Sequence, residues 1–225
     1  MSFSLSYRGR RLLRALAVST VLVGGLGGVT AAMAPAASAA TCSNIDVVVA
    51  RGTFEPGTLG IIVGDPVFSA LQTAIPGQTL SSYPVNYPAN LGEPASVQAG
   101  NTDLVNHVTS QAAACPGQRF ILVGYSQGAN VVDNSIGISS DGALVGGAIV
   151  ATIPSSLTSR IVAILQFGNP IRAQGKSITG VFQSRTDDFC ADQDPVCQNG
   201  GSNVLAHLSY GGDAAAAATF AAGKA

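Results

Sequence analysis

Ser126 lies in the segment GYSQG, residues 124–128, with a glycine two positions away on either side. The apolar run 120–123 before it is typical of a strand, and residues 129–132 after it are typical of the start of a helix. At such a turn a strained backbone lifts the serine hydroxyl above the edge of the sheet, and the glycines leave room for the crossing backbone. The segment therefore predicts a nucleophile elbow with Ser126 as the attacking group.

A serine hydroxyl is a weak nucleophile at neutral pH and needs a neighbouring base. The chain has two histidines, His107 and His207. His207 follows Ser126, which matches the Ser, acid, His order of the α/β-hydrolases, whereas proteases of the trypsin or subtilisin type place their histidine before the serine. We therefore expect His207 to be the base and His107 to lie on the surface of a helix.

A carboxylate that orients the base is expected between Ser126 and His207 in the sequence. Six residues qualify by position: Asp133, Asp141, Asp187, Asp188, Asp192 and Asp194. Only the last two lie between Cys190 and Cys197, where a cross-linked loop, stiffened by Pro195, could hold an acid against the base. The residues alone leave Asp192 and Asp194 as alternatives.

The four cysteines, Cys42, Cys115, Cys190 and Cys197, all follow residue 40. An even number of cysteines in an exported chain indicates disulfides. We expect the close pair Cys190 and Cys197 to join across a short loop, which leaves Cys42 to bond Cys115. Metal binding is disfavoured because no Cys-x-x-Cys motif or nearby histidine completes a ligand set, and no cofactor is expected.

The N-terminal 40 residues have the three parts of a secretory signal peptide. Basic residues at 8, 10, 11 and 14 precede an apolar stretch, 15–29, and a small-residue segment, 32–40, that suits a signal peptidase. Glycines within the apolar stretch disfavour a membrane anchor, and the paired arginines do not decide between export pathways. We expect residues 1–40 to be removed and the protein to be secreted, either extracellular or associated with the cell wall.

Residues 41–225 are long enough for one domain with a well-buried core. They carry seven basic and twelve acidic residues, a net charge of about -5, because four of the eleven basic residues belong to the N-terminal segment. No basic run follows residue 40, so nucleic acid is not expected as a partner. We expect a monomer.

Strand-like and helix-like stretches alternate along residues 41–225, which predicts an α/β fold with a mainly parallel sheet of about five strands between two layers of helices. The predicted strands are 45–50, 79–85, 120–124, 160–167 and 180–184. The predicted helices are 67–75, 97–114 and 127–136, with shorter ones at 204–207 and 214–222. The stretch 137–159 is expected to be a helix end and a loop with one short apolar element at 148–153.

The sequence resembles the cutinase family in four blocks that together span most of the chain from Cys42 to Asp213. These blocks are Arg51-Gly52-Thr53 with Glu55, Gly57, Leu59 and Gly60; GYSQG at 124–128; Asp194-Pro195-Val196-Cys197; and His207-Leu208-Ser209-Tyr210. The resemblance implies a compact α/β-hydrolase fold, Ser126 as nucleophile, His207 as base and Asp194 as the acid, in preference to Asp192. It also implies the disulfides Cys42 to Cys115 and Cys190 to Cys197. The region 136–159 carries none of the resemblance.

The tetrahedral intermediate of acyl transfer needs hydrogen-bond donors for its oxyanion. Gln127 follows the nucleophile at a helix N-terminus, so its backbone N–H is expected to point at that oxygen. A second donor is expected from the loop after the first strand. The resemblance implies that this donor is Thr53, through its N–H and its hydroxyl.

No long apolar insertion is available to form a lid, so we expect an exposed serine and an open site that accepts bulky esters, with transient contact to lipid or polymer surfaces. The apolar residues expected to line its mouth are Leu59, Ile61, Ile62, Val196, Val204 and Leu205. The sequence thus predicts a secreted serine esterase acting on ester or lipid substrates. Acyl transfer to an alcohol by the same residues, or a binding protein without turnover on the same scaffold, are the alternatives.

Overall fold

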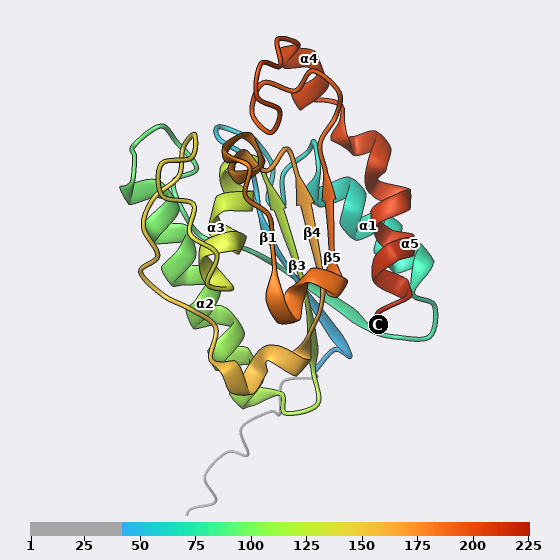
Figure 1. Cartoon of the computed structure of the whole chain (residues 1–225). Helices are drawn as coiled ribbons and strands as arrows, with labels where there is room; N and C mark the ends of the chain where they lie inside the picture. The colour runs from blue at the N-terminus through green and yellow to red at the C-terminus, as the bar shows by residue number, and fades with distance from the viewer. Residues whose placement is uncertain (1–41) are drawn as a thin grey trace, which may run out of the picture. The chain divides into compact units, whose positions relative to one another are not determined.

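The computed structural model describes residues 42–225, and the predicted signal peptide lies outside this part. Strands and helices alternate in it (Figure 1). The strands are β1 Ile45–Ala50, β2 Leu80–Pro84, β3 Arg119–Tyr125, β4 Ile161–Phe167 and β5 Thr186–Phe189. The helices are α1 Gly64–Ala74, α2 Ala95–Ala114, α3 Gln127–Ser135, α4 Val204–His207 and α5 Ala214–Ala222, with short 3-10 helices between several of them.

The five strands form one parallel sheet in the order β2-β1-β3-β4-β5. From β1 the chain continues to β2 on one side of β1, and then crosses over so that β3 lies on the other side of β1. In sheets of this kind ligands bind outside the carboxyl ends of the strands where the order reverses. Here that point lies between β1 and β3, whose following loops carry Thr53 and Ser126.

Two layers of helices cover the sheet. In Figure 1 helices α2 and α3 lie on one face and α1 and α5 on the other. Alternate residues of β1, such as Val47 and Val48, pack into different cores, the first with α1 and α5 and the second with α2 and α3. Burial on both faces explains why the central strands are continuous apolar runs. The predicted three-layer α/β fold is confirmed.

Two predicted elements are wrong. Residues 180–184 are not a strand but part of the 3-10 helix Gly180–Arg185, and the last strand follows as β5. β5 contains Asp187 and Asp188 and has a half-buried pattern, so it lacked the apolar signal of a strand. Residues 148–153 form neither helix nor strand, since the backbone N–H groups of Val150 and Ala151 donate to the side chain of Asn101.

Two disulfides join Cys42 to Cys115 and Cys190 to Cys197. The first ties the start of β1 to the end of α2, and the second closes the loop after β5. Within residues 42–225 no helix is long and apolar enough to cross a membrane. The same residues contain no cluster of three or more His, Cys, Asp or Glu side chains able to hold a metal ion.

His107 lies on α2 and is partly exposed, as predicted, but its ring is held by other side chains. Its Nε2 lies 2.7 Å from Oδ2 of Asp46, a buried residue near the start of β1, and its ring stacks on Tyr83. Asp46 pairs with Phe120 in the sheet, whereas Ser126 follows the opposite end of β3. His107 therefore links α2 to the sheet, away from the nucleophile.

A buried polar cluster lies between α3 and the last two strands. Gln166 donates to Oδ1 of Asp133 at 2.8 Å, while Oδ2 of Asp133, Nδ2 of Asn169 and Oδ1 of Asp188 have no hydrogen-bond partner. Burial raises the pKa of the Asp133 carboxyl well above its ordinary value, and the nearby Asp188 raises it further. Burial likewise raises the pKa of Asp188 to about 6, opposed by the adjacent Arg172.

These raised pKa values predict that the protein loses stability with rising pH. The folded state binds more protons than the unfolded chain between about pH 4, where free aspartates titrate, and the raised values, so the free energy of unfolding falls across this interval. Replacing Asp133 by Asn removes the buried carboxylate and is expected to raise the free energy of unfolding at pH 8 by about 1–3 kcal/mol. Urea unfolding from pH 4 to 8 measures this.

The exposed Asp141→Asn is the matched control and is expected to follow the wild type at every pH. If Asp133→Asn lowers stability at pH 8 by as much as at pH 4, the carboxylate is a net stabilising group and the prediction is wrong.

Candidate active site

Ser126 occupies the sharp turn between β3 and α3. Its backbone has φ 54° and ψ -119°, a region that residues with a side chain rarely adopt. A Cβ atom on Gly128 would lie 1.9 Å from the carbonyl oxygen of Ala50, and one on Gly124 would lie 2.4 Å from Oε1 of Gln166. Both glycines are therefore required by close packing, as the elbow predicts.

The expectation of an exposed serine needs correction. Only 7% of the Ser126 surface is accessible, because the flanking strands and α3 enclose its backbone. Its side chain nevertheless lines an open pocket together with His207 and Thr53. Among the described residues Ser126 Oγ makes no hydrogen bond to His207, and catalytic hydrogen bonds of this kind often tighten only when substrate is bound.

His207 is the last residue of α4 and is held by Asp194, which lies in the loop after β5. His207 Nδ1 lies 2.8 Å from Oδ2 of Asp194. Gly168, with φ +56°, lies against the imidazole, since a Cβ there would be 2.7 Å from Cε1 of His207. The carbonyl oxygen of His207 also accepts a hydrogen bond from the hydroxyl of Tyr125 at 2.7 Å. These contacts fix the ring and direct Nδ1 toward the carboxylate.

Asp194 is fully buried and accepts three hydrogen bonds. Besides the His207 ring, the backbone N–H of Val196 donates to Oδ1 at 2.8 Å and the hydroxyl of Tyr210 donates to Oδ2. Burial raises the pKa of Tyr210, and its bond to Asp194 raises it further, so the phenol stays a donor. Asp192 is exposed and does not contact His207. The structure therefore brings Asp194, and not Asp192, to the histidine.

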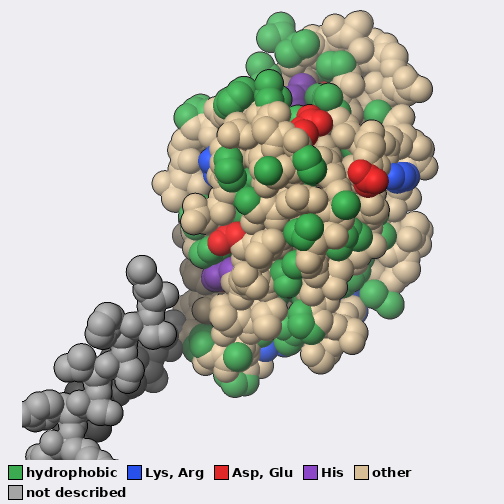
Figure 2. Space-filling model, turned by 90° about the vertical axis from the view of Figure 1, so that its left-hand side faces the viewer, with side chains coloured by type: hydrophobic (Ala, Val, Ile, Leu, Met, Phe, Trp, Pro, Cys, Tyr) green, Lys and Arg blue, Asp and Glu red, His purple; other side chains and the backbone are tan. Residues whose placement is uncertain are grey.

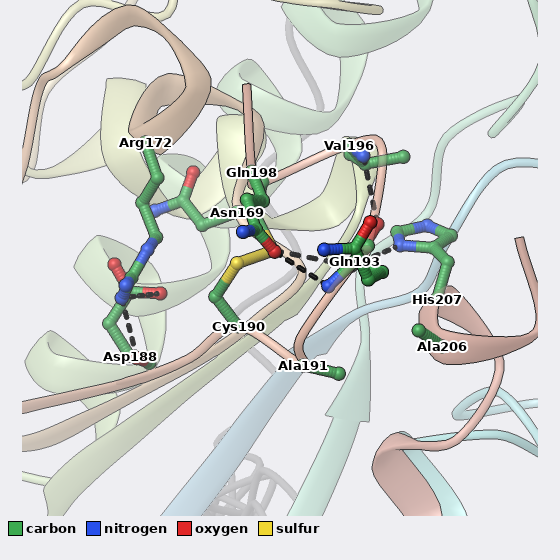
Figure 3. The surroundings of a disulfide bond; sticks show 12 residues. Asn169, Arg172, Asp188, Cys190, Ala191, Gln193, Val196, Gln198, Ala206 and His207 are labelled. Carbon is green, nitrogen blue, oxygen red and sulfur yellow. Dashed lines mark hydrogen bonds and ion pairs between the residues drawn. A yellow bond between two sulfur atoms is a disulfide. The ribbon is translucent and has the colours of Figure 1, made fainter. Parts of the chain in front are cut away.

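The disulfide Cys190 to Cys197 closes the loop that carries Asp194. Figure 3 shows the bond between the Arg172–Asp188 pair on one side and His207 on the other. Tyr210 stabilises the same loop, because its hydroxyl accepts a hydrogen bond from the N–H of Ala191 at 3.0 Å. No role was predicted for Tyr210 from the sequence, although it belongs to the block that begins at His207.

Thr53 and Gln127 lie on either side of the switch point in the sheet. Gln127 is the first residue of α3, so its N–H has no partner within the helix. Its buried side chain is held by Ser96 and by the carbonyl oxygen of Asn90, both at 2.8 Å. Oγ1 of Thr53 is buried without a hydrogen-bond partner, and Thr53 lines the same pocket as Ser126.

Glu55 organises the loop that carries Thr53. Its carboxylate accepts hydrogen bonds from the N–H groups of Gly52 and Ile62, both at 2.7 Å, and from Val63 at 3.3 Å. Burial raises the pKa of Glu55 above its ordinary value, while these donors and Arg51 lower it. The loop therefore folds around a buried acid. The sequence identified Glu55 only as part of a family block.

The pocket has a volume of about 420 Å³ and mostly apolar walls. Of the residues expected at its mouth, Ile62 and Val196 line it. Leu59 belongs instead to the core, and Ile61, Val204 and Leu205 are exposed outside the pocket. The walls that the sequence missed are Phe54, Pro56, Leu91, Leu144, Val145 and Leu208. These residues come from irregular loops, where no periodic pattern indicates which side chains face the site.

Large exposed apolar side chains gather around the pocket. Phe54, Leu91, Leu144 and Leu208 line it and are each about half exposed or more. Figure 2 shows hydrophobic side chains clustered at the upper end of the α2 and α3 face, around a histidine. Of the Asp, Glu, Lys, Arg and His side chains in the described residues, only the buried Glu55 and His207 line this pocket. The opening is therefore apolar and nearly free of charge.

A family model described as Cutinase matches residues 41–225. A cutinase of Kineococcus radiotolerans is 39% identical over 191 residues, which cover 82% of this chain and 63% of that protein. The carboxylesterase Culp1 of Mycobacterium tuberculosis is 35% identical over 200 residues, covering 84% of this chain and 85% of that protein.

The solved structure of Trichoderma reesei cutinase in complex with a phosphonate inhibitor is similar to this fold, with a TM-score of 0.65 and 33% identity. The match covers 80% of this chain and 75% of that one. These relatives are esterases, and the match of the family model extends over the whole described structure. The chain therefore belongs to the cutinase family of carboxylic ester hydrolases.

Proposed function

We propose that this protein is a secreted serine esterase that cleaves carboxylic esters through Ser126, His207 and Asp194. The observation that carries the proposal is the convergence of Ser126, on its strained turn, and His207, held by the buried Asp194, on one apolar pocket. Three segments far apart in the sequence meet there, and each supplies the group that ester hydrolysis needs at that position.

The proposed reaction begins when Ser126 Oγ attacks the ester carbonyl and passes its proton to Nε2 of His207. Asp194 accepts the Nδ1–H bond, which keeps Nε2 free to take the proton and stabilises the imidazolium that results. His207 then returns the proton to the departing alcohol, leaving an acyl-enzyme on Ser126. Water, deprotonated by the same histidine, releases the acid and restores the serine.

The oxyanion that forms in both steps would be held by Thr53 and by the N–H of Gln127. Both groups lack partners within their own elements, so they can donate to a new oxygen without breaking an existing bond. Donors that are already in place cost no reorganisation when the charge develops. Glu55 and the Ser96 and Asn90 contacts to Gln127 hold the two segments in place.

The proposed substrates are esters with an apolar acyl group, including lipid and polyester surfaces. The pocket is apolar and its rim carries exposed hydrophobic side chains, so it can accept a chain from an aggregate or film. The phosphonate complex of the Trichoderma reesei relative supports serine ester chemistry in this family. The features of residues 1–40 and the two disulfides support secretion.

The triad is tested with Ser126→Ala and Asp194→Asn. Ser126→Ala is expected to abolish hydrolysis of p-nitrophenyl butyrate, and Asp194→Asn to lower kcat by about 10⁴-fold because the imidazole then prefers the wrong tautomer. Asp192→Asn is the matched control on the same loop and is expected to keep wild-type kcat. Near wild-type turnover by the Ser126→Ala variant, or a large loss in Asp192→Asn alone, contradicts the proposal.

The Thr53 hydroxyl is tested with an isosteric replacement. Thr53→Val is expected to lower kcat by about 10²–10³-fold, the usual effect of removing one oxyanion donor. Its melting temperature is expected to be unchanged or higher, because the buried hydroxyl makes no hydrogen bond in the absence of substrate. Thr53→Ser retains the donor and is expected to keep most of the activity. A Thr53→Val enzyme with wild-type kcat excludes the hydroxyl from the reaction.

A further inference from the structure

Two of the chain segments that line the pocket follow Ser126 in the sequence, and the others come from the loops after β1 and β2. Val196 and Leu208 come from the segments that carry Asp194 and His207. Leu144 and Val145 come from the segment 137–153 after α3, which carries none of the family motifs. This second segment runs over the α2 and α3 side of the molecule (Figure 1).

The wall made by Leu144 and Val145 is anchored to the helix that begins beside the nucleophile. Asn130 of α3 donates its side-chain amide to the carbonyl oxygen of Leu144 at 2.9 Å. One turn further along, Asn134 accepts from the N–H of Ser140 and donates to the carbonyl oxygen of Gly147, both at 2.9 Å. Both asparagines are fully buried. The wall is therefore fixed relative to Ser126 and is not a free loop.

Val145 is the enclosed part of this wall. It is 5% exposed, whereas its neighbour Leu144 is 60% exposed at the rim. Its φ of 49° is a conformation that β-branched residues rarely adopt. The anchored turn therefore holds the backbone of Val145 in an unfavourable conformation. A residue held in this way lines the pocket at a fixed position.

The chemistry assigns the two sides of the pocket to different parts of the ester. His207 must protonate the departing oxygen, so the alcohol part lies on the side of His207, with Val196 and Leu208. We propose that the acyl chain, on the other side of the carbonyl carbon, extends toward the wall made by Leu144 and Val145. Val145 then forms the end wall of the acyl site and sets the acyl length that the enzyme prefers; this inference rests on the proposed function.

The proposal is tested by making the side chain at position 145 smaller in one variant and larger in another. Val145→Ala removes two methyl groups from the wall, and Val145→Ile adds one carbon and keeps the β-branched shape. We expect Val145→Ala to raise kcat/KM for longer acyl chains relative to acetyl, by about fourfold for each CH₂ newly accommodated (about 0.8 kcal/mol). Val145→Ile is expected to shift the preference toward shorter chains. The measurement is kcat/KM over p-nitrophenyl esters from acetyl to dodecanoyl.

Val150→Ala is the matched control, because Val150 lies on the same segment, is 52% exposed and does not line the pocket. It is expected to keep the wild-type profile. Acetate esters of alcohols of increasing length are expected to show no change in profile with either Val145 variant. If both variants lower every rate by one common factor, or shift the profile in the same direction, Val145 is only a structural residue and the proposal is overturned.

A binding measurement separates this inference from the proposed function. In a Ser126→Ala background, the affinity for intact p-nitrophenyl esters is expected to show the same opposite shifts with Val145→Ala and Val145→Ile. If those shifts occur while the wild type shows no turnover, the proposed function fails and the acyl site stands. If turnover requires Ser126 but affinity does not depend on Val145, the acyl site fails alone.

Discussion

The buried carboxylate of Asp194 holds together the parts of the site that lie after β5. A carboxylate without water is costly to bury unless donors replace the solvent, and Asp194 has donors from His207, Val196 and Tyr210. Each donor comes from a different point between residues 196 and 210, so satisfying one carboxylate fixes the path of the whole segment. The disulfide across 190–197 limits the alternatives that this segment could adopt in the unfolded chain.

A second buried carboxylate does the same for the loop after β1. Glu55 gathers the N–H groups of Gly52, Ile62 and Val63, which would otherwise be unpaired in a loop without regular structure. Both loops line the pocket that contains Ser126. One is organised around Glu55 and presents Thr53, and the other is organised around Asp194 and presents His207. The strands determine where each loop begins, and the buried carboxylates of Glu55 and Asp194 determine the conformation of each loop.

The sequence predicted the elements whose physics is local and repetitive. The runs at β1, β3 and β4 are buried on both faces and appear as unbroken apolar segments, so their positions were correct to within about a residue. β5 was misplaced because this edge strand is half-buried and contains two aspartates. The motif at 124–128 predicted the elbow, because such a turn has no room for a side chain at the two glycine positions.

The pocket walls could not be predicted in this way. The segment 137–153 has no helix or strand period, and its shape depends on side-chain hydrogen bonds from Asn101 on α2 and from Asn130 and Asn134 on α3. Such hydrogen bonds produce no periodic pattern in the sequence, so neither Leu144 nor Val145 could be assigned to the site from composition or spacing. The chemistry of the site is encoded in short motifs with steric requirements, whereas the shape of the substrate site is encoded in long-range polar contacts. If the acyl site is as proposed, relatives that share the motifs are expected to differ in the acyl groups they accept, because substitutions in such a segment alter the wall without touching the elbow or the buried acids.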